Sequence, residues 1–514
     1  MRRRVETTVQ EGAQAFQTLI LLLGAFGTAS AWAQVGPASA FQARMGGTLQ
    51  ISDNLSSRQE VQDRGALLVL TPGLSYSRRT ASVQASVDYG LSLVAPWRVV
   101  EQPDAVQHQL NARARFSPQG TGLLLDGGAS IGRQSLSAFG LQRPVGGSAF
   151  GGTENQREVY ALNFSPSWQT RIGSLANFSV SHRSALTNTK DSLVGDATTQ
   201  ETTVSLGSIS RGALGWGLRG ARSAIKPKAG LRGLTESAVV YVSWSPDADW
   251  QINANAGQER SNLRQQGRES GPSHGLGLTW TPSPRTQLQA QYDDRAFGRT
   301  HRLSFNHRMP RANFSLSESR TLSEPGALGG IGARTHYELL FAQLATVEPD
   351  PLRRDQLVRQ QLLALGLDPN GIATNGLITS RPALTRQQVL TGAWNTPRST
   401  WSMALSRSDS RRFGTALQGF EDLAQSSRVL LTSANLSAAY RFSSRSSLNL
   451  TLQVQRNEGD TDALRNDVQS GVLTWTMSLD RRQQFNASLR HSESDAAQRS
   501  FSENALVMGY QYQF

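Results

Sequence analysis

The chain has no cysteine in its 514 residues. This absence excludes disulfide bonds, thiolate metal sites and cysteine nucleophiles. Beyond the first 33 residues it also lacks an apolar run long enough for a transmembrane helix, which takes about 20 residues. Hydrophobic residues make up 38% of the chain, and its mean hydropathy is −0.39. Such a polar chain is either disordered or a β-barrel with a polar lumen, and regular alternation distinguishes the two.

Lysine is also scarce. Only Lys190, Lys226 and Lys228 occur among the 52 basic residues, so the other 49 are arginines, and the formal net charge is +13. Arginine binds carboxylate, phosphate and sulfate groups with two parallel hydrogen bonds. A basic chain often binds nucleic acid, but an export signal argues against that and favours anionic lipopolysaccharide or an acidic polymer. The alternative is that the arginines only solvate the surface.

The export signal lies at the N-terminus. Arginines at 2–4, an apolar run at 19–26 and the small-x-small triplet at 31–33 predict a secretory signal peptide over residues 1–33. The apolar run is too short to span a membrane. We expect the first strand near Phe41, which leaves no room for a preceding plug domain and disfavours a TonB-dependent transporter.

Period-two alternation of polar and apolar residues predicts strands throughout residues 34–514. About ten alternating residues between turns are typical of a strand in an outer-membrane β-barrel. Counting strands between the turns gives about 22, and we accept any number from 16 to 22. An even number of strands keeps both termini in the periplasm. The fold class predicted is an all-β, antiparallel transmembrane barrel in the outer membrane of a Gram-negative bacterium. Clear alternation occurs at 106–116, 213–219, 287–292, 302–308, 434–442, 447–455 and 485–491.

The predicted turns fall into two classes. Short periplasmic turns and long extracellular loops are usual in such barrels, with aromatic residues at the membrane interfaces. Short turns flanked by aromatic residues are expected at 116–118, 164–166, 244–250, 280–284, 394–401 and 440–445. Longer polar loops are expected at 134–156, 187–199, 261–272, 410–427 and 457–466.

The last nine residues have the pattern of a final barrel strand. Leu506 and Met508 share one face with Tyr510, Tyr512 and Phe514, while small and polar residues occupy the other. An apolar face ending in aromatic residues fits lipid contact and the headgroup girdle. We predict that Tyr510, Tyr512 and Phe514 form the C-terminal assembly signal, with the barrel assembly machinery as a partner.

Residues 334–387 interrupt the alternation. Within them, residues 355–366 predict a helix with an apolar stripe that includes Val358. Long structured loops of barrels often fold inward, so one hypothesis is a plug or gate in the lumen. The other is an external cap without a gating role.

Strand parity predicts which arginines line the lumen. Together with inward amide side chains they would form a wet channel that attracts anionic sugars. The alternative is that they pair with lumen acids and brace the wall, although few inward acids are apparent from the alternation. The lumen-lining candidates are Arg113, Arg115, Arg219, Arg302, Arg308, Arg441 and Arg490.

Signals for catalysis and metal binding are weak. Residues 271–275 match G-x-S-x-G, but that motif needs a strand, a turn and a helix. Asp293, Asp294 and His301 resemble the acidic and histidine groups of outer-membrane proteases, although solvated loop charge explains them as well. The acidic segment 458–467 lacks the spacing of an EF-hand calcium loop. The sequence therefore predicts no enzyme, no cofactor and no metal site.

Short motifs carry a family resemblance. Residues 70–79 read LTPGLSYSRR and residues 52–55 read SDNL. With the insertion near residue 350 and the terminal Phe514, the chain resembles the outer-membrane proteins associated with the PEP-CTERM/exosortase system of Gram-negative bacteria that make exopolysaccharide. The resemblance implies a barrel encoded with polysaccharide-export or biofilm-matrix machinery, and it implies no catalytic residues.

Three classes of function fit these observations. The first is a conduit or porin-like channel that serves exopolysaccharide export, with an anionic exopolysaccharide and periplasmic export proteins as partners. The second is a purely structural or interaction barrel. The third, ranked last, is an outer-membrane hydrolase.

Overall fold

The computed structural model describes residues 39–514 with gaps, and the chain divides into Met1–Ala40 and Phe41–Phe514. The fold below is that of the second unit. The predicted signal peptide and most of the predicted helix at 355–366 lie outside the described residues. The gaps are 56–63, 98–103, 143–154, 193, 210–211, 230–231, 264–266, 324–333, 336, 338–339, 342–353, 355–357, 359–371, 375–378, 380–381, 415–420, 481 and 497–499.

Twenty-two strands form a single antiparallel sheet, and the short strands β16 and β17 pair separately. No helix among the described residues is long and apolar enough to cross a membrane. The elements are β1 (Ser39–Ser52), β2 (Gly65–Arg79), β3 (Val83–Trp97), β4 (Val106–Phe116), β5 (Leu123–Ser135), β6 (Gln156–Ile172), β7 (Ala176–Thr189), β8 (Ala197–Ser208), β9 (Leu214–Pro227), β10 (Gly233–Trp244), β11 (Trp250–Ser261), β12 (Glu269–Ser283), β13 (Thr286–Arg295), β14 (Gly298–Arg308), β15 (Ala312–Ser323), β16 (Arg334–Thr335), β17 (Ile372–Thr374), β18 (Ala383–Asn395), β19 (Ser399–Arg412), α4 (Asp422–Gln425), β20 (Arg428–Arg441), β21 (Ser446–Glu458), the 3-10 helix η3 (Asp462–Leu464), β22 (Arg465–Ser478), β23 (Gln483–Ala496) and β24 (Phe501–Gln513).

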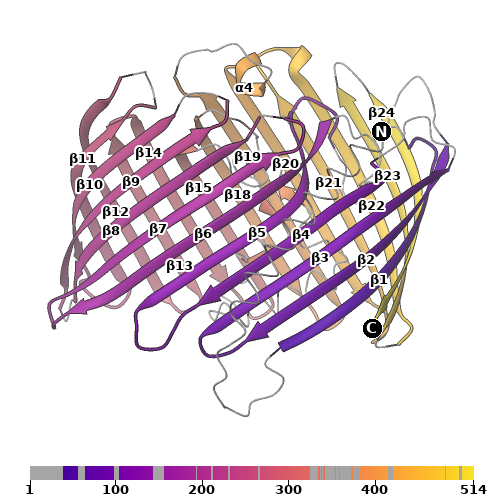
Figure 1. Cartoon of the computed structure of the whole chain (residues 1–514), viewed down its shortest axis with the longest axis horizontal. Coiled ribbons are helices and arrows are strands. Elements are labelled where there is room, and N and C mark those ends of the chain that lie inside the picture. The colour runs from indigo at the N-terminus through magenta and orange to yellow at the C-terminus, as the bar shows by residue number, and fades with distance from the viewer. Residues whose placement is uncertain are drawn as a thin grey trace, which may run out of the picture. The chain divides into compact units, whose positions relative to one another are not determined.

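The sheet closes on itself. β1 pairs with β24 in a register that runs from Arg44↔Gln513 to Ser52↔Ala505, which joins the first strand to the last (Figure 1). Closure matters because each unpaired backbone group in lipid costs several kcal/mol, so an open edge is not viable there. The predicted all-β outer-membrane barrel and its count of about 22 strands are confirmed.

The two ends of the barrel differ in loop length. The C-terminus lies at the end with short turns such as 245–249 and 309–311. The helix α4 lies at the opposite end, which carries the long connections 324–382 and 413–427 (Figure 1). Short turns mark the periplasmic end of such barrels and long loops the extracellular end.

Alternation along each strand separates a lipid-facing side from a lumen-facing side, and β21 is a clear case. Leu450, Leu452 and Val454 point outward and are 36%, 42% and 51% exposed. Thr451 and Gln453 point inward and are 8% and 5% exposed. Apolar residues on the outer face need no water, and the inner polar residues find partners in the lumen.

Several predicted boundaries were wrong. Residues 164–166, expected as a short turn, lie inside β6, where Pro166 stands at a break in the pairing with β7 because proline has no N–H to donate. Residues 383–387, assigned to the insertion, belong to β18, and β12 begins within the loop expected at 261–272.

Candidate functional site

A loop from one side of the barrel docks on the inner wall of the other. This mouth loop, residues 136–142, follows β5. Asn457 Nδ2 donates to the Ala138 carbonyl at 2.6 Å, and Asn466 Nδ2 donates to the Gly140 carbonyl at 2.6 Å. Both asparagines are fully buried and lie at the extracellular ends of β21 and β22. The mouth loop therefore crosses part of the extracellular opening.

The helix α4 holds the same loop from a third direction. Asp422 accepts the Ser137 hydroxyl and the Ala138 N–H, both at 2.6 Å. Burial raises the pKa of the Asp422 carboxyl to about 6, which outweighs the opposing effect of these two hydrogen bonds. Leu423 and Ala138 belong to a buried apolar cluster that completes the contact.

Described residues of the insertion between β15 and β18 lie in the lumen. Its described residues Tyr337, Leu340 and Val358 form a buried cluster with Ala439 of β20. Val358 is helical, as predicted, and is fully buried. Since Ala439 faces inward, these side chains lie against the inner wall and not above the barrel.

A cationic and aromatic stack ties the insertion to the opposite wall. The Arg113 guanidinium of β4 lies 4.9 Å from the centre of the Tyr337 ring. Tyr337 stacks on Phe341 at 5.6 Å, and the Arg354 guanidinium lies 4.7 Å from the Phe341 ring centre. Such contacts strengthen when they are shielded from water.

The insertion reaches deep into the barrel. Arg113 and Ala439 are each within three residues of a periplasmic strand end, whereas the insertion leaves β15 at the extracellular end. The described residues thus favour the inward-folding hypothesis over an external cap. A gating role stays a prediction.

Among the seven predicted lumen arginines, Arg115 and Arg490 contact acids. Arg115 Nε contacts Asp126 at 3.0 Å, and both side chains are well exposed. Arg490 contacts Glu503 at 2.7 Å, and both are almost fully buried. These two arginines brace the wall, as the alternative hypothesis proposed.

The other five arginines are placed differently. Arg113 stacks on Tyr337, and Arg441 donates to the Pro397 carbonyl at 3.3 Å. Arg219 and Arg302 are exposed and form no ion pair with any residue that the structure describes. Arg308 is partly buried near a periplasmic turn. The role of all seven in channel selectivity stays a prediction.

Acids that face the lumen are paired with arginines on other strands, and the alternation does not reveal these pairs. Arg44 of β1 contacts both oxygens of Asp88 at 2.7 and 2.8 Å, and Arg295 contacts the buried Glu259 at 2.6 Å. Each acid is on an inward position, but its partner is on another strand. Only the register between strands, which alternation does not provide, would have identified the pairs.

The residues considered for catalysis do not assemble. Ser273 lies in the middle of β12, in extended backbone opposite Gly257, and not at a strand–turn–helix elbow. Asp293 faces inward and accepts from Asn255 and Gln291, whereas His301 contacts Glu318 on the outer face.

The acidic segment 458–467 is likewise not gathered around a point. Asp467 is paired with Arg456 and Arg465, and Asp460 accepts the Ser427 N–H. Among the described residues, no group of three or more acidic or histidine side chains is placed to hold a metal ion.

The C-terminal residues lie at the seam. The Phe514 N–H donates to the Ala43 carbonyl of β1 at 2.9 Å, and its ring lies 4.9 Å from that of Tyr512. The Tyr510 hydroxyl donates to Gln483 at 3.0 Å. Their role as an assembly signal stays a prediction.

No protein-family model and no curated protein matches the chain. The siderophore receptor PirA from Pseudomonas aeruginosa is similar in structure, with a TM-score of 0.43, 10% identity, and 94% of this chain and 81% of that chain covered. The apoprotein form of the FrpB iron transporter from Neisseria meningitidis (F5-1 variant) has a TM-score of 0.47, 11% identity and coverages of 93% and 82%. A loop-deletion mutant of OmpT from Vibrio cholerae has a TM-score of 0.29, 11% identity and coverages of 93% and 100%. At these values the likenesses carry no information about substrate.

The closed sheet, the lipid-facing rows and the two unequal ends define the class. The chain is an outer-membrane β-barrel of the channel type, with a polar lumen that its own loops enter from the extracellular side.

Proposed function

We propose that this barrel is a gated conduit for an anionic exopolysaccharide, and that it serves the export system to which its short motifs point. The observation that carries the proposal is a polar inner wall against which described residues of the insertion, Tyr337, Leu340 and Val358, are packed. The wall supplies the hydrogen-bonding groups that sugars need, and the insertion would keep the pore closed between transport events.

Amide and hydroxyl groups dominate the filled side of the lumen. Asn449, Gln453 and Gln455 of β21 point inward and are 3–5% exposed. Neither amide atom of Asn449 has a partner among the described residues. Buried amides of this kind need hydrogen bonds, and water or sugar hydroxyls can provide them when the insertion moves.

The open side of the lumen supplies positive charge. Arg219 and Arg302 are exposed, and no acid among the described residues neutralises either of them. A wet channel with unneutralised arginines raises the local concentration of anions. This favours acidic sugars over neutral ones as the transported polymer.

The association with the PEP-CTERM/exosortase system rests on the motifs at 52–55 and 70–79. The first lies where β1 ends and the second lies inside β2, next to the seam. We therefore include that system in the proposal as the source of the polymer.

The test is to delete the gene and measure polysaccharide in the surface and periplasmic fractions. We expect surface polymer to fall and periplasmic polymer to accumulate, with wild-type protein restoring both. A variant with both Arg219→Glu and Arg302→Glu should restore less surface polymer, because reversed lumen charge repels an acidic chain. The charge-matched control carries both Arg285→Glu and Arg398→Glu, which lie in exposed periplasmic turns.

The outcome that contradicts the proposal is an unchanged distribution of polymer in the deletion strain. That result would favour the alternative of a purely structural or interaction barrel. A third outcome is loss of surface polymer in the deletion strain together with full restoration by the double variant. That outcome would support a conduit but would contradict the role of Arg219 and Arg302 in it.

A further inference from the structure

A row of polar and charged side chains runs across the outer face of the barrel. Cross-strand pairing places Gln388 beside Arg407, Arg407 beside Thr432, Thr432 beside Arg456, and Arg456 beside Asp467. The row therefore follows the cross-strand direction over β18–β22. It lies in the extracellular half of these strands and points away from the lumen.

An apolar row lies two residues closer to the periplasm on the same face. Leu316, Leu390, Leu405, Ala434 and Val454 are direct neighbours on β15 and β18–β21. The two rows line one groove of about 610 Å³. Ala434 is the smallest side chain of the apolar row, so the groove is hollowed between Leu405 and Val454.

Beside the groove, arginines outnumber the acids that they contact. Asp409 is shared by Arg411 and Arg428, and Asp467 is shared by Arg456 and Arg465. Each group of three has a net positive charge.

Arg407 adds a further positive charge in the middle of the groove. Its side chain is exposed and forms no ion pair or side-chain hydrogen bond among the residues that the structure describes. Glu318, an acid that also lines the groove, contacts Arg386 at 2.6 Å and His301 at 3.2 Å. The groove thus has a free guanidinium above an apolar floor.

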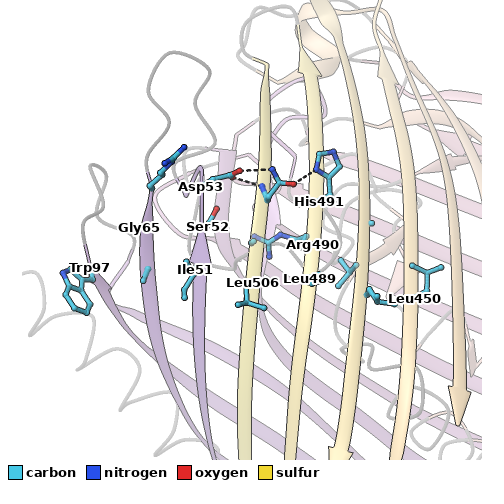
Figure 2. A pocket seen from close by; sticks show the side chains of 17 residues that line it. Ile51, Ser52, Asp53, Gly65, Trp97, Leu450, Leu489, Arg490, His491 and Leu506 are labelled. Atoms are coloured by element: carbon cyan, nitrogen blue, oxygen red, sulfur yellow. Dashed lines mark hydrogen bonds between the residues drawn. The ribbon is translucent and has the colours of Figure 1, made fainter. Parts of the chain in front are cut away.

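The outer face has a second groove, which differs from the first in the composition of its rim. It lies at the seam of β1 and β24, where Ile51, Leu489 and Leu506 form the apolar row (Figure 2). Its rim holds a hydrogen-bonded chain, in which Asn504 donates to Asp53 and contacts His491 at 2.8 Å (Figure 2). This groove also has an exposed arginine, Arg64, but Arg64 precedes β2, whereas Arg407 lies within β19 in register between Gln388 and Thr432.

We propose that the groove over β18–β21 binds a phosphorylated, acylated glycolipid of the outer leaflet, the lipid A part of lipopolysaccharide. Arg407 binds a phosphate through its planar donors, with Thr432 and Gln388 beside it as further hydrogen-bonding groups. An acyl chain lies over Leu390, Leu405 and Ala434. The order of the two rows fits such a lipid, because its phosphates would meet the polar and charged row while its acyl chains would cover the apolar row.

The experiment measures lipid binding to the purified full barrel in detergent by native mass spectrometry. The probes are bisphosphorylated lipid A, the same lipid without its phosphates, and inorganic phosphate alone. We expect wild type to bind the first probe at least about tenfold more tightly than the second, the size expected for one charge-assisted contact. Inorganic phosphate should neither bind strongly nor displace the lipid.

Two variants test the two rows separately. Arg407→Glu should reduce affinity for bisphosphorylated lipid A by at least about tenfold and remove the preference for phosphate. Ala434→Trp should fill the groove and weaken both lipids without changing charge. Arg398→Glu makes the same charge change at the periplasmic end of the same β18–β19 hairpin and should bind as wild type does.

Equal binding of the phosphorylated and dephosphorylated lipids would overturn the proposal, as would displacement by inorganic phosphate alone. An Arg407→Glu barrel with normal lipid binding would also overturn it. Correct folding of each variant is checked by the heat-dependent gel shift of intact barrels, and Arg407→Gln serves if the charge reversal does not fold. The result is independent of what passes through the lumen.

Discussion

At the scale of single residues, ion pairs in the lumen differ in how much water reaches them. Arg490 and Glu503 are only 1% and 6% exposed, and Glu503 also accepts the Ser52 hydroxyl at 2.7 Å. Arg115 and Asp126 are 50% and 39% exposed. A buried pair depends on both partners, because the remaining charge would lack both water and a counter-charge, whereas water screens an exposed pair.

This difference predicts unequal effects of two matched substitutions. Glu503→Gln should lower the free energy of unfolding by about 3 kcal/mol or more, since it leaves Arg490 charged and buried. Asp126→Asn should cost about 1 kcal/mol or less. Urea unfolding in liposomes, followed by tryptophan fluorescence, measures both. Equal costs would show that water reaches Arg490.

At the scale of loops and helices, the mouth loop docks on α4 through one carboxyl. The pKa of Asp422 is raised by burial from 3.8 to about 6, so the docked state favours the protonated form. Docking is therefore strongest below pH 4, weakens as the pH rises to 6, and stays weak above it. The mouth loop should open more readily in neutral than in acidic surroundings.

Hydrogen exchange of residues 136–142, corrected for the intrinsic effect of pH, tests this expectation. Protection in the wild type should be greater at pH 5 than at pH 7.5. Asp422→Asn, an uncharged side chain of the same shape, should show similar protection at both values. A wild type whose protection does not change with pH would contradict the role of Asp422.

At the scale of the whole molecule, closure of the sheet and filling of the lumen are separate features. Hydrogen bonds between neighbouring strands hold the barrel together, and the pairing of β1 with β24 closes it. The insertion adds side-chain contacts at Ala439 and Arg113 but no strand of the barrel. Loss of those contacts should therefore open the pore without unfolding the barrel.

Val358→Asp tests this separation. A carboxylate at a fully buried site needs water, so the cluster with Ala439 should come apart. We expect larger or more frequent conductance steps in planar bilayers, with an unchanged heat-dependent gel shift. Val358→Ile preserves the apolar contact and should behave as the wild type does. Unchanged conductance for Val358→Asp would mean that the insertion does not block the pore.

Local pattern was sufficient for most of the strands. In β21, each apolar residue from Leu448 to Val454 is followed by a polar one. The lipid-facing and the lumen-facing sides of this strand are therefore evident from the sequence alone. The pattern failed at 164–166, where a proline inside a strand resembles a turn. A proline breaks a hydrogen bond in both settings, and only the neighbouring strand shows that the chain continues.

The sequence by itself determined the barrel, its approximate strand number and its direction, because these depend on the period of two and on turn lengths along the chain. Only the tertiary structure decided which arginines have acids beside them and which remain free. It also placed Asn457 against Ala138, 319 residues away, and Arg407 beside Thr432 on the outer face. Such contacts depend on register and on how loops fold back across the barrel, and neither leaves a periodic trace in the chain.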